Sequence, residues 1–406
     1  MAVGQFPFPQ MAVVPGVELA TASAGIKKPG RQDVVVISVA EESRVAGVFT
    51  KNAFCAAPVT LARQHLAQGN IRFLIINSGN ANACTGEPGL ADALQTCSEL
   101  AAQAGVRPEQ VLPYSTGVIG ERLPMTKLLG AIPAALAGLQ ADNWEAAARA
   151  IMTTDTRPKG ASVQFEHDGE TIVINGISKG AGMIKPNMAT MLGYIATNAR
   201  VEQTLLNELS RAAADQSFNR ITIDGDTSTN DACMLIATGK TALPEIASRD
   251  GELFEKFQQA LLQVYRFLAH AIVADGEGAT KFVTVQVEGS ECQAEALRVA
   301  YAVAQSPLIK TALFASDPNW GRIVAAIGYA GVKGLDATAV RVWLNDVLIV
   351  EGGGRAVTYT EEQGQAVMNG EEILIRIDLG RGDICETVWT TDLSHDYVTI
   401  NAEYRT

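Results

Sequence analysis

Histidine is scarce in this sequence, and the few that occur are not spaced to bind a metal. The 406 residues contain His65, His167, His270 and His395. No two of them stand at i, i+4 or at another spacing typical of metal ligands. His270 lies in a run with helical periodicity and His167 precedes a turn, which favours a structural role for both. We therefore expect no zinc centre, and a catalytic base that is not an ordinary histidine.

Paired cysteines and long apolar runs are also missing. The six cysteines are scattered without a C-x-x-C pair, so they indicate neither a zinc site nor a disulfide framework. No stretch approaches the ~18 apolar residues of a membrane span. The first residues, MAVGQFPFPQ, lack a basic cluster followed by an apolar run and do not resemble a secretory signal. We expect a cytoplasmic protein with reduced thiols and no membrane partner.

Positive charge is in deficit. Lys and Arg number 32 against 44 Asp and Glu, giving a formal net charge of −12. Affinity for phosphate backbones comes from clustered Lys and Arg, so we expect no nucleic-acid partner. Small molecules or other proteins are the expected partners. With 47% hydrophobic and 19% charged residues, the chain can bury a large core in two or three domains.

Strand and helix patterns alternate along the chain. Strand-like runs occur at 33–40, 72–77, 281–287 and 372–379, and helical periodicity at about 90–104, 143–153, 202–216 and 251–274. Asp168-Gly169 and Asn345-Asp346 each separate two β-branched runs, as in hairpins. The patterns predict an α+β, layered α/β protein, with a boundary near 285–290 between a core of about 1–285 and a C-terminal unit of 286–406.

Glycine loops that bind nucleotides are incomplete. Gly239-Lys240-Thr241 resembles the end of a phosphate loop, but Met234 stands where the pattern requires glycine. The segment at 276–278 has two glycines, lacks the third at the required spacing and follows a predicted helix. We expect no nucleotide cofactor at either place.

Residues 176–198, GISKGAGMIKPNMATMLGYIATN, form the most unusual segment. Three of its four glycines and its proline precede an apolar strand-like run, with Thr190 at the junction. The segment is consistent with a plain loop-to-strand junction. It is also consistent with a strained Ala189–Thr190 peptide bond that the Thr190 hydroxyl attacks, which would leave Thr190 with a free α-amine. Since an α-amine has a pKa near ~8, it can act as a base at neutral pH.

Three further features are candidates for a site. A predicted turn at 114–120 carries Thr116 and Gly117, whose donors could converge on an oxyanion or simply form an ordinary turn. The amide-rich segment 77–82 could shape a pocket or satisfy a tight loop. Lys179 and Glu277 are flanked by small residues, and if they line one cleft they would pair a carboxylate and an ammonium of an amino acid, although solvated positions are usual for such residues.

Several of these segments together resemble one family. They are NSGNANACTG (77–86), STGVIG (115–120), MTTDT (152–156), KGAGMIKPNMATML (179–192), DGDTSTND (224–231), DGEGATK (275–281) and DPNWGR (317–322). The resemblance runs nearly end to end and is to the glutamate N-acetyltransferases, also called ornithine acetyltransferases, of arginine biosynthesis.

The resemblance implies a fold, a maturation step and a reaction. The fold is an αββα sandwich of the self-processing N-terminal-nucleophile type in its own topology, with a smaller α/β C-terminal domain whose tail returns to the active site. Maturation is autocatalytic cleavage into an α chain, 1–189, and a β chain, 190–406, which associate as an α2β2 heterotetramer. The reaction is ping-pong transfer of acetyl from N2-acetylornithine through Thr190 to glutamate, without a cofactor. Whether acetyl-CoA is a second donor stays open.

The resemblance also assigns site residues by motif. Thr116 and Gly117 match the oxyanion-hole pair of the family. The family's substrate-contacting positions correspond here to Thr156, Lys179, Thr190, Glu277, Asn401 and Thr406. Two alternatives remain for the activity. A related self-processing aminopeptidase or amidohydrolase would give the acyl group to water, and an amino-acid-binding protein would keep the pocket without turnover.

Overall fold

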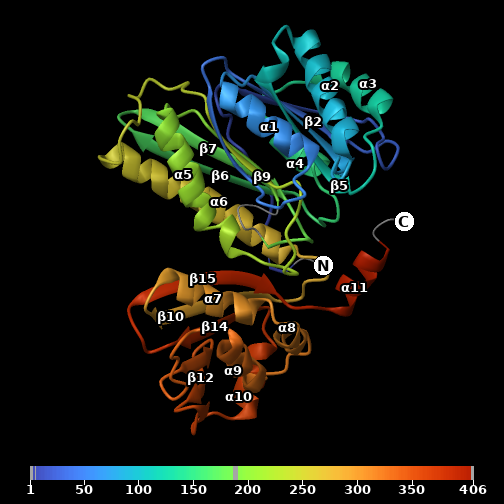
Figure 1. Ribbon diagram of the computed structural model, residues 1–406. Coiled ribbons are helices and arrows are strands. Elements are labelled where there is room, and N and C mark those ends of the chain that lie inside the picture. Colours follow the sequence, from blue (N-terminus) through green and yellow to red (C-terminus); the bar gives the residue numbers. More distant parts are fainter. Residues whose placement is uncertain (1–2, 5, 186–190, 404–406) are drawn as a thin grey trace.

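Two β-sheets lie face to face with helices on both outer faces, and a third sheet forms a separate lobe (Figure 1). The computed structural model describes residues 3–4, 6–185 and 191–403. The predicted α+β class is confirmed. No helix in these described ranges is long and apolar enough to cross a membrane.

The first sheet has the strand order β1-β2-β4-β5. Its strands are β1 (Val17–Ala22), β2 (Val34–Val39), β4 (Phe73–Asn80) and β5 (Val111–Val118). The helices α1 (Ala57–Gln68), α2 (Gly86–Ala104), α3 (Met125–Ala137) and α4 (Trp144–Ala150) accompany it. Because neighbouring side chains of a strand point to opposite faces, Val35 and Ile37 of β2 enter the core between the sheets, whereas Val34 and Val36 pack with residues of α2 and α3.

The second sheet has the order β3-β9-β8-β7-β6. Its strands are β3 (Arg44–Phe49), β6 (Lys159–His167), β7 (Glu170–Lys179), β8 (Leu192–Thr197) and β9 (Ala232–Ala237). The helices α5 (Gln203–Asp215) and α6 (Glu252–Ala274) pack on its outer face. Between the two sheets, the rings of Tyr114 and Tyr194 meet edge to face at 5.4 Å. The layers are therefore helix, sheet, sheet and helix, as expected.

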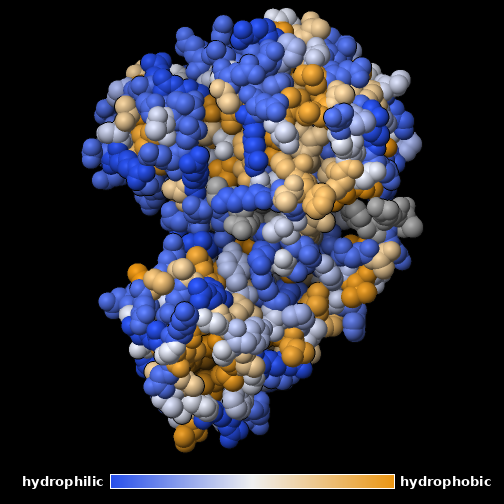
Figure 2. Space-filling model, viewed as in Figure 1, coloured by the Kyte–Doolittle hydropathy of each residue, from blue (hydrophilic) through white to orange (hydrophobic). Residues whose placement is uncertain are grey.

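The third sheet has the order β13-β12-β11-β14-β10-β15 and makes up the lower lobe in Figure 1. Its strands are β10 (Phe282–Ser290), β11 (Arg341–Leu344), β12 (Val347–Glu351), β13 (Gly354–Arg355), β14 (Glu372–Asp378) and β15 (Ile384–Thr391). Its helices are α7 (Gln293–Ala304), α8 (Pro307–Phe314), α9 (Trp320–Tyr329) and α10 (Glu361–Met368). The surface narrows between this lobe and the sandwich (Figure 2).

The segment near 285–290, where the sequence places a domain boundary, lies within strand β10 of the third sheet. After β15, the chain leaves this lobe and ends in α11 (His395–Ala402), which Figure 1 shows extending back toward the sandwich. The extent of the domains stays a prediction.

Both predicted hairpins are present. Asp168 and Gly169 join β6 to β7 with positive φ angles of 47° and 79°, the backbone that a tight two-residue hairpin requires. Asn345 and Asp346 join β11 to β12. The turn predicted at 114–120 is wrong, because β5 continues to Val118 by parallel pairing with β4.

Candidate functional site

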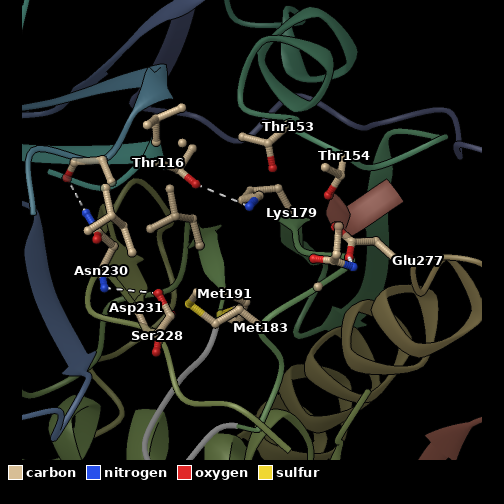
Figure 3. A pocket seen from close by; sticks show the side chains of 17 residues that line it. Thr116, Thr153, Thr154, Lys179, Met183, Met191, Ser228, Asn230, Asp231 and Glu277 are labelled. Carbon is tan, nitrogen blue, oxygen red and sulfur yellow. Dashed lines mark hydrogen bonds between the residues drawn. The ribbon is translucent and has the colours of Figure 1, made fainter. Parts of the chain in front are cut away.

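One cavity of about 280 Å³ opens where the two sheets of the sandwich meet the end of α11. Figure 3 shows side chains from several distant parts of the chain pointing into it. We call it the Lys179 cavity. It is lined by Ala81, Thr116, Gly117, Val118, Ile119, Thr153, Thr154, Lys179, Gly182, Met183, Met191, Leu192, Ser228, Asn230, Asp231, Glu277 and Asn401.

Thr116 and Gly117 enter the cavity from the end of β5. Gly117 has a φ of 137°, and a Cβ added there would lie 2.2 Å from the carbonyl carbon of Gly79 on β4. Only glycine fits this close approach of two strands. Asn230 holds the same strand end by donating to the carbonyl oxygens of Ala81 and Ser115 at 2.6 and 2.9 Å. The Thr116–Gly117 backbone is therefore fixed from two sides.

Lys179 ends β7, and its ammonium donates to the Thr116 hydroxyl at 3.2 Å. Burial lowers the pKa of Lys179, and the nearby Lys159 adds to this effect, whereas the carboxylates of Asp155, Asp231 and Glu277 oppose it. The cation is thus held in a site where its charge is costly unless an anion joins it. A substrate carboxylate would be such an anion.

A buried ion triad lies behind Lys179. The Lys159 ammonium is 2.6 Å from carboxylate oxygens of both Asp155 and Asp275, and all three side chains are inaccessible or nearly so. Asp155 also accepts the Gly180 N–H at 2.7 Å. Burial alone would raise the pKa of Asp155, but the charges of Lys159 and Lys179 and these hydrogen bonds lower it below its ordinary value. The triad connects the end of β7 to the end of α6.

Glu277 follows α6 and faces Lys179 across the cavity (Figure 3). It is 8% exposed, and its backbone N–H donates to the Ala181 carbonyl oxygen at 2.8 Å. Asn401, on α11, donates to a Glu277 carboxylate oxygen at 2.7 Å. The cavity therefore has a cationic end at Lys179 and an anionic end at Glu277, two residues that lie far apart in the sequence.

Three of the predicted residues, Ala189, Thr190 and Thr406, lie outside the described residues. Hydrogen bonds fix the chain beside the cavity both before residue 186 and after residue 190. The Asp224 carboxylate accepts the N–H groups of Met183 and Ile184 at 2.6 and 2.8 Å. On the other side, Met191 accepts the Ala232 N–H at 3.0 Å. Met183 and Met191 both line the cavity, so the predicted cleavage point is bracketed by cavity residues.

Of the remaining predictions, Thr116, Gly117, Lys179, Glu277 and Asn401 meet in this one cavity, and Thr156 does not line it. The Thr156 hydroxyl and N–H instead bind the Asp275 carboxylate. Its substrate contact stays a prediction.

Two nearby threonines, Thr153 and Thr154, do line the cavity, in the same T-T-D-T motif. The sequence assignment weighed these two neighbours and placed the substrate contact at Thr156 by its spacing to Lys179.

Asp231 is a cavity residue that the sequence did not predict. It closes the hydroxyl-rich and acidic stretch 224–231 and lines the cavity beside Met191. Its Oδ2 is buried without a hydrogen-bond partner among the described residues. Burial raises the pKa of Asp231 well above its ordinary value, opposed by Ser228 and by the charge of Lys179. A carboxyl with a raised pKa holds its proton more tightly than an ordinary one, which makes Asp231 a candidate proton donor in the cavity.

The amide side chains of segment 77–82 donate to backbone carbonyl oxygens, both within the segment and in other parts of the chain. Asn77 donates to the Asn80 carbonyl oxygen at 2.8 Å, and Asn82 donates to that of Gly89 at the same distance. Of these residues, only Ala81 lines the Lys179 cavity. In the described residues, no group of three or more His, Cys, Asp or Glu side chains could hold a metal.

Comparison with known proteins gives a consistent result. The model of the ArgJ family matches residues 18–406. Two curated relatives, each named arginine biosynthesis bifunctional protein ArgJ, come from Pseudomonas fluorescens (strain Pf0-1) and Pseudomonas syringae pv. tomato (strain ATCC BAA-871 / DC3000). Each is 65% identical to this chain over 406 residues, covering 100% of both chains. A crystal structure of ornithine acetyltransferase from Mycobacterium tuberculosis, complexed with ornithine, is 36% identical with a TM-score of 0.39, covering 43% of this chain and 94% of that one.

Proposed function

This chain belongs to the ArgJ family, and from that premise we propose that it transfers an acetyl group from N2-acetylornithine to glutamate through Thr190. It is an acyltransferase of arginine biosynthesis. The curated relatives are named bifunctional, and we propose that acetyl-CoA is a second acetyl donor. Residues 1–189 and 190–406 would form the two chains of an α2β2 assembly in the cytoplasm.

One observation carries the proposal for the site. Met183 and Met191 bracket the predicted cleavage point, and both line the cavity that holds Thr116, Lys179 and Glu277. A nucleophile released between them would therefore begin its chain at this cavity.

The charges of the cavity fit N2-acetylornithine. This substrate carries an α-carboxylate and a side-chain ammonium, whereas its α-nitrogen is a neutral amide. Lys179 would pair the carboxylate, and Glu277, oriented by Asn401, would pair the ammonium. The acetyl group would then lie between them, near Thr116 and Gly117.

The proposed chemistry needs only groups of the chain. The Thr190 oxygen attacks the acetyl carbonyl carbon, and its hydroxyl proton passes to the Thr190 α-amine. The Thr116 hydroxyl and the Gly117 N–H stabilise the oxyanion. The amide C–N bond breaks, and the α-amine returns the proton to the departing ornithine. Glutamate then attacks the acetyl-Thr190 ester through its own amine, which restores the Thr190 hydroxyl and gives N-acetylglutamate.

The test is the chain composition and the transfer activity of the purified protein. We expect two fragments of similar size on a denaturing gel, one with the N-terminal sequence TMLGY. Thr190→Ala should give one intact, inactive chain, and Thr190→Ser should still be cut. A fully active wild type that stays intact would refute the proposal. Release of acetate from acetylornithine at the same rate with and without glutamate would favour the hydrolase instead.

A further inference from the structure

A second cavity adjoins the first on the far side of the β5 end. Its volume is about 240 Å³, and it shares Gly117, Thr153 and Thr154 with the Lys179 cavity. We call it the Lys28 cavity. Its lining consists of Lys27, Lys28, Arg31, Asp33, Ser78, Gly79, Gly117, Met152, Thr153, Thr154, Ile400 and Glu403. A ligand bound in it would therefore reach Gly117 from outside the Lys179 cavity.

Three cations gather in this lining, in a chain whose net charge is −12. They lie within five consecutive residues, Lys27 to Arg31. Arg31 donates to the Met152 carbonyl oxygen, which uses one of its five N–H donors. Lys28 is exposed, and no ion pair or hydrogen bond joins it to the described part of the chain. At least two of the three cations thus retain donors for a ligand.

The carboxylate of Asp33 forms its hydrogen bonds with backbone N–H groups rather than with the three cations. Its two oxygens accept the backbone N–H groups of Ala24 and Ile26, both at 2.6 Å, and the side chain is 2% exposed. Asp33 therefore closes the loop that carries the cations, and its oxygens already have hydrogen-bond donors. Glu403, at the end of α11, is the other carboxylate of the lining.

The basic segment also packs directly on the strands of the candidate oxyanion site. A Cβ added to Gly79 would lie 3.1 Å from the Lys27 Cβ, and Gly79 is the β4 partner of Gly117. The loop is thus held at a fixed distance from Gly117 by strand pairing. Because the cations lie on a built cavity wall, the ligand they bind would be oriented relative to the acetyl-transfer site.

Inside the Lys179 cavity, Lys179 and Glu277 already pair the two charges proposed for N2-acetylornithine. In the lining of the Lys28 cavity, three cations outnumber two carboxylates, and Lys28 and Arg31 retain hydrogen-bond donors, so this cavity favours a ligand with negative charge. Phosphate groups carry several charges and are the usual ligands of clustered Lys and Arg. We propose that the Lys28 cavity binds the phosphate groups of acetyl-CoA, with the thioester reaching Gly117. This inference rests on the proposed function. In the transfer, the acetyl carbon exchanges its bond to sulfur for one to the Thr190 oxygen, and the hydroxyl proton leaves with the thiol.

The test compares donors with and without phosphates in the full-length, matured protein. Donors are acetyl-CoA, acetyl-pantetheine, which lacks phosphates, and N2-acetylornithine, each with saturating glutamate. Variants are Lys28→Gln, Lys28→Gln combined with Arg31→Gln, and the control Lys333→Gln, an exposed lysine of the other lobe. For the double variant, we expect KM for acetyl-CoA to rise roughly tenfold relative to KM for either phosphate-free donor. The control should leave this ratio unchanged.

Other outcomes overturn the inference. An unchanged ratio would show that the cations do not bind phosphate during turnover. A rise in KM for glutamate with every donor would assign the cavity to a carboxylate. If the wild type uses N2-acetylornithine but neither thioester, the inference fails together with the proposal of acetyl-CoA as a second donor, and the proposed transfer from N2-acetylornithine stands. If it does not use N2-acetylornithine either, the proposed function itself fails.

Discussion

The ammonium of Lys179 lies 3.2 Å from the hydroxyl oxygen of Thr116 and donates to it. A hydroxyl oxygen that accepts one hydrogen bond still has its own hydrogen to donate. The adjacent positive charge strengthens that donation, because hydrogen bonds in a chain polarise one another. Lys179 thus has two roles in the proposed site, as a partner for a carboxylate and as a support for the oxyanion donor.

Replacement of Thr116 by Val tests the oxyanion donor. Val keeps the branched shape but has no hydroxyl, and losing one such donor typically lowers kcat by about 100- to 1,000-fold. We expect this loss in the acetylornithine-to-glutamate assay, measured on protein whose chain composition has been checked by mass spectrometry. Thr116→Ser keeps the hydroxyl and should retain most activity. A Thr116→Val enzyme within twofold of wild type would exclude the role.

The pH dependence of the reaction tests the charge of Lys179. Burial lowers the pKa of Lys179, so the ammonium is charged below this lowered pKa and neutral above it. We expect kcat/KM for N2-acetylornithine to fall as the pH rises through that value. In Lys179→Arg, the guanidinium stays charged, and this alkaline fall should disappear even if the rate is lower. The same alkaline fall in both enzymes would assign it to another group.

Gly182→Ala tests the position of Glu277. A Cβ on Gly182 would lie 2.4 Å from the Glu277 carboxylate oxygen that accepts the Asn401 hydrogen bond, so this carboxylate must shift and we expect the bond to be lost. Loss of a charge-assisted hydrogen bond costs about 1.5–3 kcal/mol, so KM for N2-acetylornithine should rise roughly 10- to 100-fold. Gly130→Ala, within α3 and with open space for a Cβ, is the matched control. Equal KM values for the two variants would contradict the assignment.

The sequence predicted local features well. Asp168-Gly169 specifies its hairpin through its own backbone preference, and the hydrophobic periodicity of 251–274 predicts α6 from local sequence alone. Lys179 and Glu277, which were singled out because small residues flank them in the sequence, both line the same cavity.

What the sequence missed depends on contacts between distant segments. β5 continues through Thr116 because β4 pairs with it there, and no local pattern shows that pairing. Thr156 binds Asp275, which is 119 residues away in the sequence, and no local pattern shows this contact. Asp231 enters the cavity only because β9 lies beside β8.

Lys159→Met tests the buried triad. It would leave Asp155 and Asp275 buried without their cation, which typically costs about 3–5 kcal/mol. We expect this loss in the free energy of unfolding, measured by urea denaturation. Adding Asp155→Asn and Asp275→Asn removes the unpaired charges and should recover part of the loss. A single variant within 1 kcal/mol of wild type would show that the triad contributes little.

The ring of His270 joins the sandwich to the lower lobe through contacts with two aromatic side chains. It lies on α6, and its ring is 4.4 Å from that of Trp389 on β15 and 5.5 Å from that of Phe282 on β10, between ring centroids. Burial, followed by the charge of Arg266, lowers the pKa of His270 to about 4. The folded protein thus keeps this ring neutral among aromatic side chains.

The sign of the resulting pH effect follows from this lowered pKa. Between pH 6.5 and about 4, the unfolded chain binds a proton at His270 that the folded chain does not, so the protein loses stability as the pH falls. One pKa unit corresponds to 1.36 kcal/mol, so wild type should lose about 2 kcal/mol more than His270→Phe between pH 7 and pH 5. Phe keeps the aromatic packing but cannot titrate. Urea denaturation at the two pH values measures the difference, and His395→Phe, at an exposed position, is the control. If His270→Phe loses as much stability as wild type, the ring is protonated in the folded state and the contact between the lobes does not exclude its charge.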